Sequence, residues 1–154
     1  MPKTAELLIP PPIVMAIAAA VMWGLSRITN FSLIPDAWRI PVTMILVLIG
    51  AVIALAGVLA FIRARTTVNP HRPDKSSVLV QNGIYRITRN PMYLGMLLAL
   101  MAWSFWLNAA VTLVTPALFI AWIHRFQILP EERVLEQNFG ESFRAYCRRV
   151  RRWL

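Results

Sequence analysis

Polar side chains gather directly before a long apolar segment in the second half of the chain. They are Arg86, Arg89, Asn90, Pro91 and Tyr93. Asparagine can cap a helix, proline suits its first position, and tyrosine and arginine are typical of a membrane surface. These structural roles explain each residue separately. They do not explain why the residues occur together just after a polar loop, so the group is also a candidate binding site.

A second polar group follows the apolar segment. His124 and Arg125 end that segment, and the adjacent acids Glu131 and Glu132 come shortly afterwards. Acids in the first turn of a helix stabilise its N-terminus, which gives the pair a structural interpretation. Two carboxylates at a membrane surface can instead bind a cationic ligand, and ionisable groups at such depth are functional candidates. Histidine changes charge near neutral pH, so His71 and His124 are the candidate bases.

Helices that cross a membrane must position these groups. The chain of 154 residues is 58% hydrophobic and its mean hydropathy is +0.58. Residues 7–26 and 40–62 carry no charge, and about 20 apolar residues suffice for one crossing. Each run therefore predicts one transmembrane helix. A signal peptide is the alternative for the first run, but its charged N-terminal region is weak and its apolar part is long.

The third apolar segment, residues 90–124, is too long for one crossing, since a helix of that length spans about 52 Å. It contains Asn108, which can cap the N-terminus of a helix. We therefore predict a helical hairpin, with helices at about 91–107 and 109–128. Together with the first two runs, this gives about four crossings.

A basic amphipathic helix is predicted after the hairpin. Pro130 and the two acids that follow it mark a helix start, and apolar residues then recur at roughly helical spacing among arginines. Gly140 is expected to divide this helix into two pieces. Such a helix is typical of a chain segment that lies on the cytoplasmic membrane face.

The net charge of +9 is distributed around the apolar runs. Basic residues concentrate in 63–90 and 125–154, whereas only Arg27 and Arg39 flank the loop between the first two runs. This positive-inside pattern places both termini and the 63–90 loop in the cytoplasm, and it favours anionic lipid headgroups over nucleic acid as the partner. The single cysteine, Cys147, excludes internal disulfides and thiolate metal clusters.

Two motifs resemble one family of enzymes. The first is Leu79 to Gly95, LVQNGIYRITRNPMYLG, and the second is Glu131 to Leu135, EERVL, followed by Phe139-Gly140 and Tyr146. With the apolar hairpin between them, they look like the isoprenylcysteine carboxyl methyltransferases and the related phospholipid methyltransferases, over about residues 66–150. The eukaryotic pattern has histidine where Asn90 stands. Asparagine keeps a hydrogen-bonding side chain there but cannot carry a proton.

The resemblance implies S-adenosylmethionine as the cofactor, in a pocket that faces the cytoplasm. The residues that it places around the cofactor are Val80, Gly83, Tyr85, Arg89, Asn90, Pro91, Tyr93, Glu131 and Glu132. Arg125 best matches an arginine that faces the substrate in the family, and the expected catalytic group is Arg125, Glu132 and His124. No metal is expected. An isoprenylcysteine carboxylate, a phospholipid amine and a thiol all remain open as the methyl acceptor.

The sequence thus predicts a single all-α, multi-pass membrane domain. Two transmembrane helices occupy 1–62 and the catalytic core occupies 63–154. The partners expected are the bilayer and a lipophilic substrate, in a bacterial inner membrane with the active site facing the cytoplasm. Two alternatives remain, a membrane reductase that uses a nicotinamide cofactor and a small non-catalytic membrane protein. The oligomeric state does not follow from the sequence.

Overall fold

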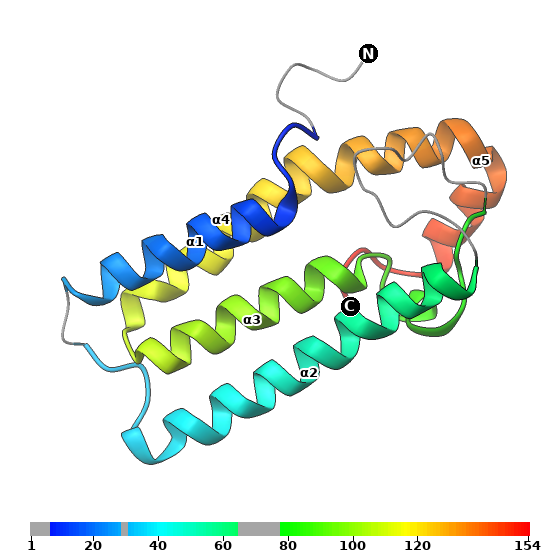
Figure 1. Ribbon diagram of the computed structural model, residues 1–154. Coiled ribbons are helices and arrows are strands. Elements are labelled where there is room, and N and C mark those ends of the chain that lie inside the picture. Colours follow the sequence, from blue (N-terminus) through cyan, green and yellow to red (C-terminus); the bar gives the residue numbers. More distant parts are fainter. Residues whose placement is uncertain (1–6, 29–30, 65–77) are drawn as a thin grey trace.

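The computed structural model describes residues 7–28, 31–64 and 78–154, and the regular structure of these residues is helical (Figure 1). The helices are α1 (Pro11–Ser26), α2 (Asp36–Arg63), α3 (Pro91–Leu107), α4 (Val114–Ile123) and α5 (Leu129–Arg149). Shorter turns are the 3₁₀ turns η2 (Gly83–Arg86) and η3 (Ala110–Leu113) and the π turn η4 (His124–Ile128). The predicted all-helical fold is confirmed for this part of the chain.

Helix α3 lies at the centre of the bundle. It contacts α2 on one side and α1 and α4 on the other, and α1 and α4 also contact each other (Figure 1). The main buried cluster forms where α1, α3, α4 and η4 meet; its members are Ala18, Met22, Tyr93, Leu100, Phe119, Ile123 and Ile128. Tyr93, one of the predicted site residues, therefore extends from α3 into the interior of the bundle.

Small residues allow α2 and α3 to approach each other closely. A Cβ atom added to Gly95 would come within 2.7 Å of the Ala54 Cβ and 2.8 Å of the Gly50 carbonyl oxygen. A Cβ atom on Gly57 would similarly lie 3.0 Å from the Pro91 Cγ. Contacts between small residues are typical of helix pairs in membranes. This close contact between α2 and α3 fixes the start of α3, and with it the polar residues that precede the helix.

The close contact between α2 and α3 leads to a stability prediction. We expect Gly95→Ala to lower the free energy of unfolding by about 1–3 kcal/mol, because the added methyl group overlaps backbone and side-chain atoms of α2. Gly24→Ala is the matched control, since nothing lies within 4 Å of a Cβ atom there. Unfolding of both variants in detergent measures the difference. Equal stability of the two variants would mean that α2 is free to move away.

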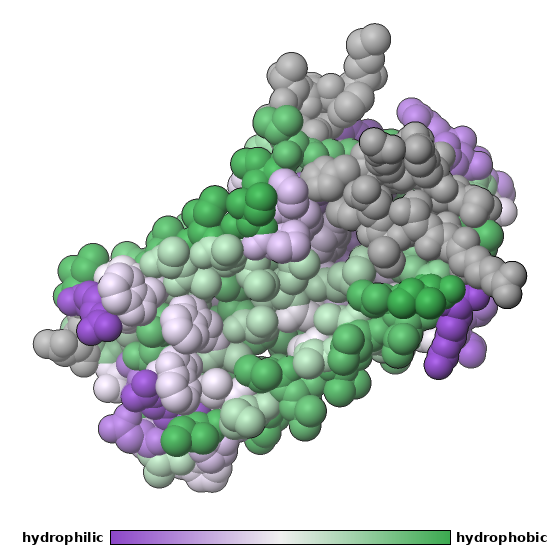
Figure 2. Space-filling model, viewed as in Figure 1, coloured by the Kyte–Doolittle hydropathy of each residue, from purple (hydrophilic) through white to green (hydrophobic). Residues whose placement is uncertain are grey.

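The outer surface of the bundle is strongly apolar. Helix α2 and the helical run Ala110–Arg149 are long and apolar enough to cross a membrane, and α1 and α3 are shorter apolar helices. Large side chains of α2 that are more than half exposed include Trp38, Met44, Leu48, Val52 and Leu55. Figure 2 shows hydrophobic residues over α1 and α2 between hydrophilic groups at the two ends. This arrangement is that of a helical membrane protein.

The prediction that Asn108 begins the second hairpin helix is wrong. Asn108 ends α3 in the left-handed conformation (φ 52°), and its Oδ1 accepts hydrogen bonds from the backbone N–H groups of Leu33 and Ile34, each at 3.0 Å. Asparagine tolerates this conformation, so it ends helices as well as beginning them. The predicted range of the first hairpin helix, 91–107, is confirmed.

The sequence predicted that the second hairpin helix ends at residue 128, but the chain continues as a helix beyond it. The chain stays helical from Ala110 to Arg149, and Leu129 alone separates the π turn His124–Ile128 from Pro130. Proline has no N–H to donate to the Phe126 carbonyl, so a regular helical bond is missing there. The backbone N–H of Leu7 donates to that carbonyl instead, at 3.1 Å. A segment near the N-terminus thus completes the helix at the π turn.

The predicted break at Gly140 is confirmed. Gly140 has φ 50° and ψ −121°, and the helix axis changes direction at this residue. The second half of α5 then packs its buried side chains Phe143 and Tyr146 against Leu79 and Leu135. The tail after α5 consequently returns to the start of α3, where Figure 1 shows the C-terminus.

Candidate cofactor and acceptor site

The C-terminal tail holds the segment before α3 in place. The backbone N–H of Arg89 donates to the Arg151 carbonyl at 3.0 Å, and the Thr88 hydroxyl donates to the Arg152 carbonyl at 3.1 Å. The Asn90 side chain does not cap α3. Its Nδ2 donates to the Arg152 carbonyl at 3.0 Å. Residues 88–90 and 151–152 therefore form one unit, although they lie some sixty residues apart in sequence.

An ion cluster joins this unit to α5. Glu132 lies 3.1 Å from Nη1 of Arg89, and it accepts three further hydrogen bonds from Arg152 at 2.8, 3.0 and 3.1 Å. The Arg89 and Glu132 side chains are only 11% and 16% exposed. The Arg89 guanidinium also donates to the Cys147 sulfur. Nε of Arg89 is buried and has no hydrogen-bond partner among the described residues.

A second buried pair connects α3 to α5. The Tyr93 hydroxyl donates to Oε1 of Glu131 at 2.5 Å, and Tyr93 is only 5% exposed. Burial raises the pKa of the Glu131 carboxyl to about 8, although the hydrogen bond from Tyr93 lowers it. Because Glu131 and Glu132 are consecutive in the helix, their side chains point in different directions. Glu131 meets α3, whereas Glu132 meets Arg89 and the tail.

Tyr85 lies near both groups of residues. Its ring packs edge-to-face against Phe61 of α2, with 5.4 Å between the ring centroids, and its carbonyl accepts a hydrogen bond from Tyr146 at 2.8 Å. Burial raises the pKa of the Tyr85 hydroxyl above its ordinary value, and the neighbouring Tyr146 and Glu131 raise it further. The phenol is therefore protonated at neutral pH and can donate a hydrogen bond.

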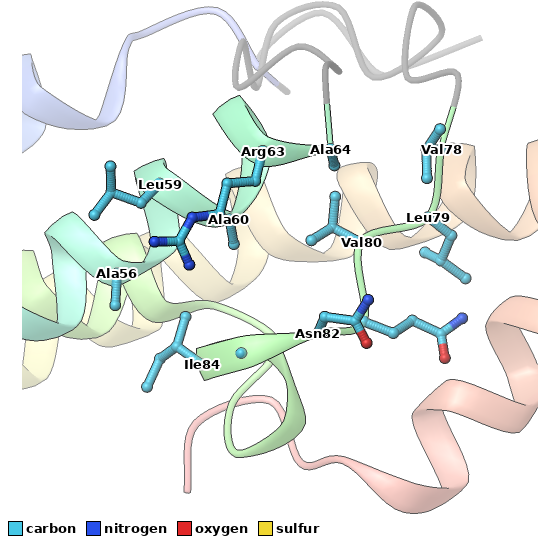
Figure 3. Close-up of a pocket in the computed structure, with 12 residues that line it drawn as sticks. Ala56, Leu59, Ala60, Arg63, Ala64, Val78, Leu79, Val80, Asn82 and Ile84 are labelled. Atoms are coloured by element: carbon cyan, nitrogen blue, oxygen red, sulfur yellow. The ribbon is translucent and has the colours of Figure 1, made fainter.

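A pocket of about 450 Å³ opens between the end of α2 and the segment 78–84 (Figure 3). Val80 and Gly83, two of the predicted cofactor residues, line it. The opposite wall includes Ala56 and Leu59, and Arg63 is a charged residue at its edge. Gly83 has φ 62°, a conformation that glycine adopts without strain and that turns the chain around the pocket.

The structure brings most of the predicted site residues together, but not all of them. Arg89, Tyr93, Glu131 and Glu132 form the two buried groups, and Asn90 donates to the Arg152 carbonyl of the tail. Val80 and Gly83 line the pocket, Tyr85 lies near Glu131, and Pro91 is the first residue of α3. Further away, His124 is half-buried at the start of the π turn. His71 lies outside the described residues.

Arg125 belongs to the π turn His124–Ile128. Its side chain is exposed, and the guanidinium carbon lies 5.5 Å from the centroid of the Phe126 ring. Residues two positions apart in a helix do not face the same way. The buried side chains of this turn are Gln127 and Ile128, both 0% exposed. The role predicted for Arg125 stays a prediction.

Sequence reasoning missed three residues of the site. Thr88 and Arg152 build the link to the tail, and Cys147 contacts Arg89. In the sequence, nothing distinguished Arg152 from the other arginines of the basic C-terminal segment.

Comparison with known proteins adds a family match. Residues 38–142 match the family described as phospholipid methyltransferase. The chain is 29% identical over 152 residues to a probable protein-S-isoprenylcysteine O-methyltransferase of Oryza sativa subsp. indica, over 94% of this chain and 76% of that protein. It is 28% identical over 153 residues to protein-S-isoprenylcysteine O-methyltransferase B of Arabidopsis thaliana, over 95% and 75% of the two chains. An uncharacterized protein of Haemophilus influenzae is 46% identical over 63 residues, which is 41% of this chain and all of that protein.

Proposed function

The chain belongs to the phospholipid methyltransferase family, and from that premise we propose that it transfers a methyl group from S-adenosylmethionine to a lipophilic acceptor in the membrane. The family and the relatives named as O-methyltransferases make it a membrane methyltransferase. The donor and the acceptor are our proposal. The observation that carries it is the buried Tyr93–Glu131 pair beside the Arg89–Glu132 cluster, because ionisable groups gathered in the interior of an apolar bundle are candidates for a functional site.

The residues present suit S-adenosylmethionine. Its amino-acid end carries a carboxylate and an ammonium group, and its nucleoside end carries hydroxyl groups and a flat ring system. The buried Nε of Arg89, which has no partner in the described part of the chain, can donate to the carboxylate. The Glu131 carboxylate can accept from the ammonium or hydroxyl groups. The pocket lined by Val80 and Gly83 has room for the ring.

The chain then contributes alignment and exclusion of water. Bound S-adenosylmethionine supplies a methyl group on a positively charged sulfur, and alignment of donor and acceptor alone can lower such a barrier by about 7–11 kcal/mol. A carboxylate acceptor needs no base, whereas an amine or a thiol must first lose a proton. We assign that proton to His124, which is half-buried at the π turn. Glu132 holds Arg89 in position for the cofactor.

We further propose four crossings, by α1, α2, α3 and the helical run that begins at Ala110, with both termini in the cytoplasm of a bacterial cell. The excess of basic residues in 63–90 and 125–154 supports this orientation. Reporter fusions after residue 33 and at the C-terminus test it. The fusion after residue 33 should report a periplasmic location and the C-terminal fusion a cytoplasmic one. A cytoplasmic signal after residue 33 would contradict the orientation.

Arg125 is our candidate for holding the anionic part of the acceptor. A guanidinium group can hold a phosphate or a carboxylate through two parallel hydrogen bonds, and lysine keeps the charge but loses this geometry. We therefore expect Arg125→Lys to slow methyl transfer while the affinity for S-adenosylmethionine stays nearly constant. Both quantities are measured on the same preparation. Normal turnover would instead make Arg125 a membrane anchor, since lysine serves equally well in that role.

The nicotinamide-dependent reductase is the second candidate. It needs several basic groups for the phosphates of its cofactor, and Arg63 is the one basic residue among those drawn around the pocket in Figure 3. A methyl-transfer assay tests the proposed function directly. Purified protein, membrane lipids and methyl-labelled S-adenosylmethionine should yield a labelled lipophilic product. Absence of label from all lipophilic fractions would count against a methyl acceptor in the membrane.

A further inference from the structure

The pocket between α2 and the segment 78–84 has two sides with different supports (Figure 3). One side is formed by residues of α2, among them Ala56 and Leu59, and α2 is fixed by its close contact with α3. The other side is the segment 78–84, whose residues before Gly83 are not helical. A segment without regular hydrogen bonds of its own depends on its neighbours for its position. The shape of the pocket therefore depends on what holds this segment.

The second half of α5, after Gly140, packs against this segment. Leu79 contacts the buried cluster that this half of the helix forms. At the surface, Nη2 of Arg149 donates to the side-chain oxygen of Gln81 at 2.8 Å. Water competes for both partners of that exposed hydrogen bond, so we expect it to contribute less than the buried contacts. One side of the pocket is thus held in place by residues some sixty positions further along the chain.

A buried hydrogen bond from Tyr146 strengthens this contact. Tyr146 is 4% exposed, and its hydroxyl donates to the Tyr85 carbonyl at 2.8 Å. Tyr85 belongs to η2, and backbone hydrogen bonds around this turn end on the carbonyls of Asn82 and Ile84. The Tyr146 hydroxyl therefore supplies the donor for the Tyr85 carbonyl. Because a buried carbonyl requires a partner, this hydrogen bond fixes the turn against α5.

The bend at Gly140 brings Tyr146 to this turn. Gly140 has φ 50° and ψ −121°, a conformation that other residues adopt only with strain. A straight continuation of α5 would lead in another direction, whereas Figure 1 shows the end of α5 next to the segment that precedes α3. Nothing lies within 4 Å of a Cβ atom added to Gly140. A substitution there consequently strains the bend without a steric clash.

We propose that Tyr146 is a positioning residue for S-adenosylmethionine, because it holds the turn Gly83–Arg86 in the conformation that receives the ring system of the cofactor. This inference rests on the proposed function, in which the ring lies in the pocket lined by Val80 and Gly83. Tyr146 acts through the backbone of Tyr85, to which its hydroxyl is bonded. Without that bond, the turn occupies the binding-competent conformation for a smaller fraction of the time. The apparent affinity falls in proportion to that fraction.

This role determines which kinetic constants change. The ring of the cofactor takes no part in methyl transfer, and loss of the Tyr146 hydroxyl leaves the charged groups of Arg89 and Glu131 unchanged. It should therefore raise KM for S-adenosylmethionine, while kcat at saturating cofactor and KM for the acceptor stay the same. A residue that only stabilises the fold would instead lower the unfolding midpoint and leave every KM unchanged.

Three variants of the detergent-solubilised protein test the inference. Tyr146→Phe removes the hydroxyl and keeps the ring, Gly140→Ala strains the bend, and a double variant combines the two changes. Thr112→Val is the matched control. The Thr112 hydroxyl is also buried and donates to a backbone carbonyl, that of Ala109 at 2.7 Å, but it lies beyond the other end of α3. Calorimetric titration with S-adenosylmethionine and its demethylated product, initial rates with membrane lipids and the unfolding midpoint are measured for each.

We expect Tyr146→Phe and Gly140→Ala each to weaken the binding of both ligands about fivefold, the effect of one hydrogen bond, with kcat unchanged. The double variant should bind about as weakly as Gly140→Ala alone, because both changes break the same contact. Thr112→Val should lower the unfolding midpoint and keep the wild-type affinity.

Three results would overturn the inference while the methyltransferase activity stands. They are wild-type affinity in Tyr146→Phe, an equal loss of affinity in Thr112→Val, and additive losses in the double variant. If Tyr146→Phe does not fold, Gly140→Ala decides alone, and wild-type affinity in that variant overturns the inference. Failure of the wild-type protein to bind either ligand removes the proposed function and the inference together.

Discussion

Glu131→Gln is expected to weaken S-adenosylmethionine binding by about 10- to 100-fold, the largest loss among the single substitutions that leave the fold intact. A hydrogen bond to a charged group contributes about 1.5–3 kcal/mol, and each 1.4 kcal/mol is a factor of ten. Glutamine keeps an oxygen that accepts from the Tyr93 hydroxyl, so the contact between α3 and α5 survives. Burial raises the pKa of the Glu131 carboxyl to about 8, so a bound cationic group would favour its ionised form, and glutamine cannot supply that charge.

Two comparisons sharpen this result. Tyr93→Phe should weaken binding only several-fold, because it removes the group that orients Glu131 and leaves the carboxylate itself. Glu136→Gln is the control on the same helix, where the carboxylate is exposed and pairs with Arg144. Calorimetric titration measures all three variants. Wild-type affinity in Glu131→Gln would reduce Glu131 to an acid that stabilises the start of its helix.

Glu132→Ala is expected to have the largest effect on stability. Glu132 neutralises Arg89, whose side chain is only 11% exposed, and it holds Arg152 of the tail. Removing one partner of a buried ion pair leaves the other charge uncompensated. We expect a loss of about 3 kcal/mol, near the lower end of the range for such pairs, because Arg152 is partly exposed. Cofactor binding should fall with it.

A second variant separates stability from binding. Arg152→Gln removes the charge of the tail but leaves the Arg89–Glu132 pair, so it should lower stability less and preserve cofactor binding. Glu141→Ala is the control, since Glu141 forms exposed ion pairs with Arg144 and Arg148 and should change little. Unfolding midpoints in detergent give the comparison. A stable Glu132→Ala protein would show that the cluster does not hold the tail in place.

The helices were largely predictable because membrane-spanning helices are set by local composition. The run after Asn90 predicted α3 to the residue, and Gly140 marked the break in α5. Asn108 was misread, since asparagine suits both ends of a helix. The continuous helix through Pro130 was also missed. It depends on Leu7, more than a hundred residues away, to satisfy the carbonyl that proline leaves without a donor.

Most residues of the candidate site could be predicted from the sequence, but which of them contact one another could not. The paired motifs indicated Tyr93, Glu131 and Glu132 as neighbours. The sequence could not show that the two acids have different partners, because this depends on where the tail returns. Arg152 and Thr88 join the site only through that return.

The most direct test of the central claim is calorimetric titration of the detergent-solubilised protein with S-adenosylmethionine, its demethylated product and a reduced nicotinamide cofactor. The two methyl-donor ligands should bind saturably and raise the unfolding temperature, because Arg89 and Glu131 offer them charged partners. The nicotinamide cofactor should do neither. Absence of heat and of thermal stabilisation by both methyl-donor ligands at millimolar concentration would contradict the account. Stabilisation by the nicotinamide cofactor alone would instead support the reductase.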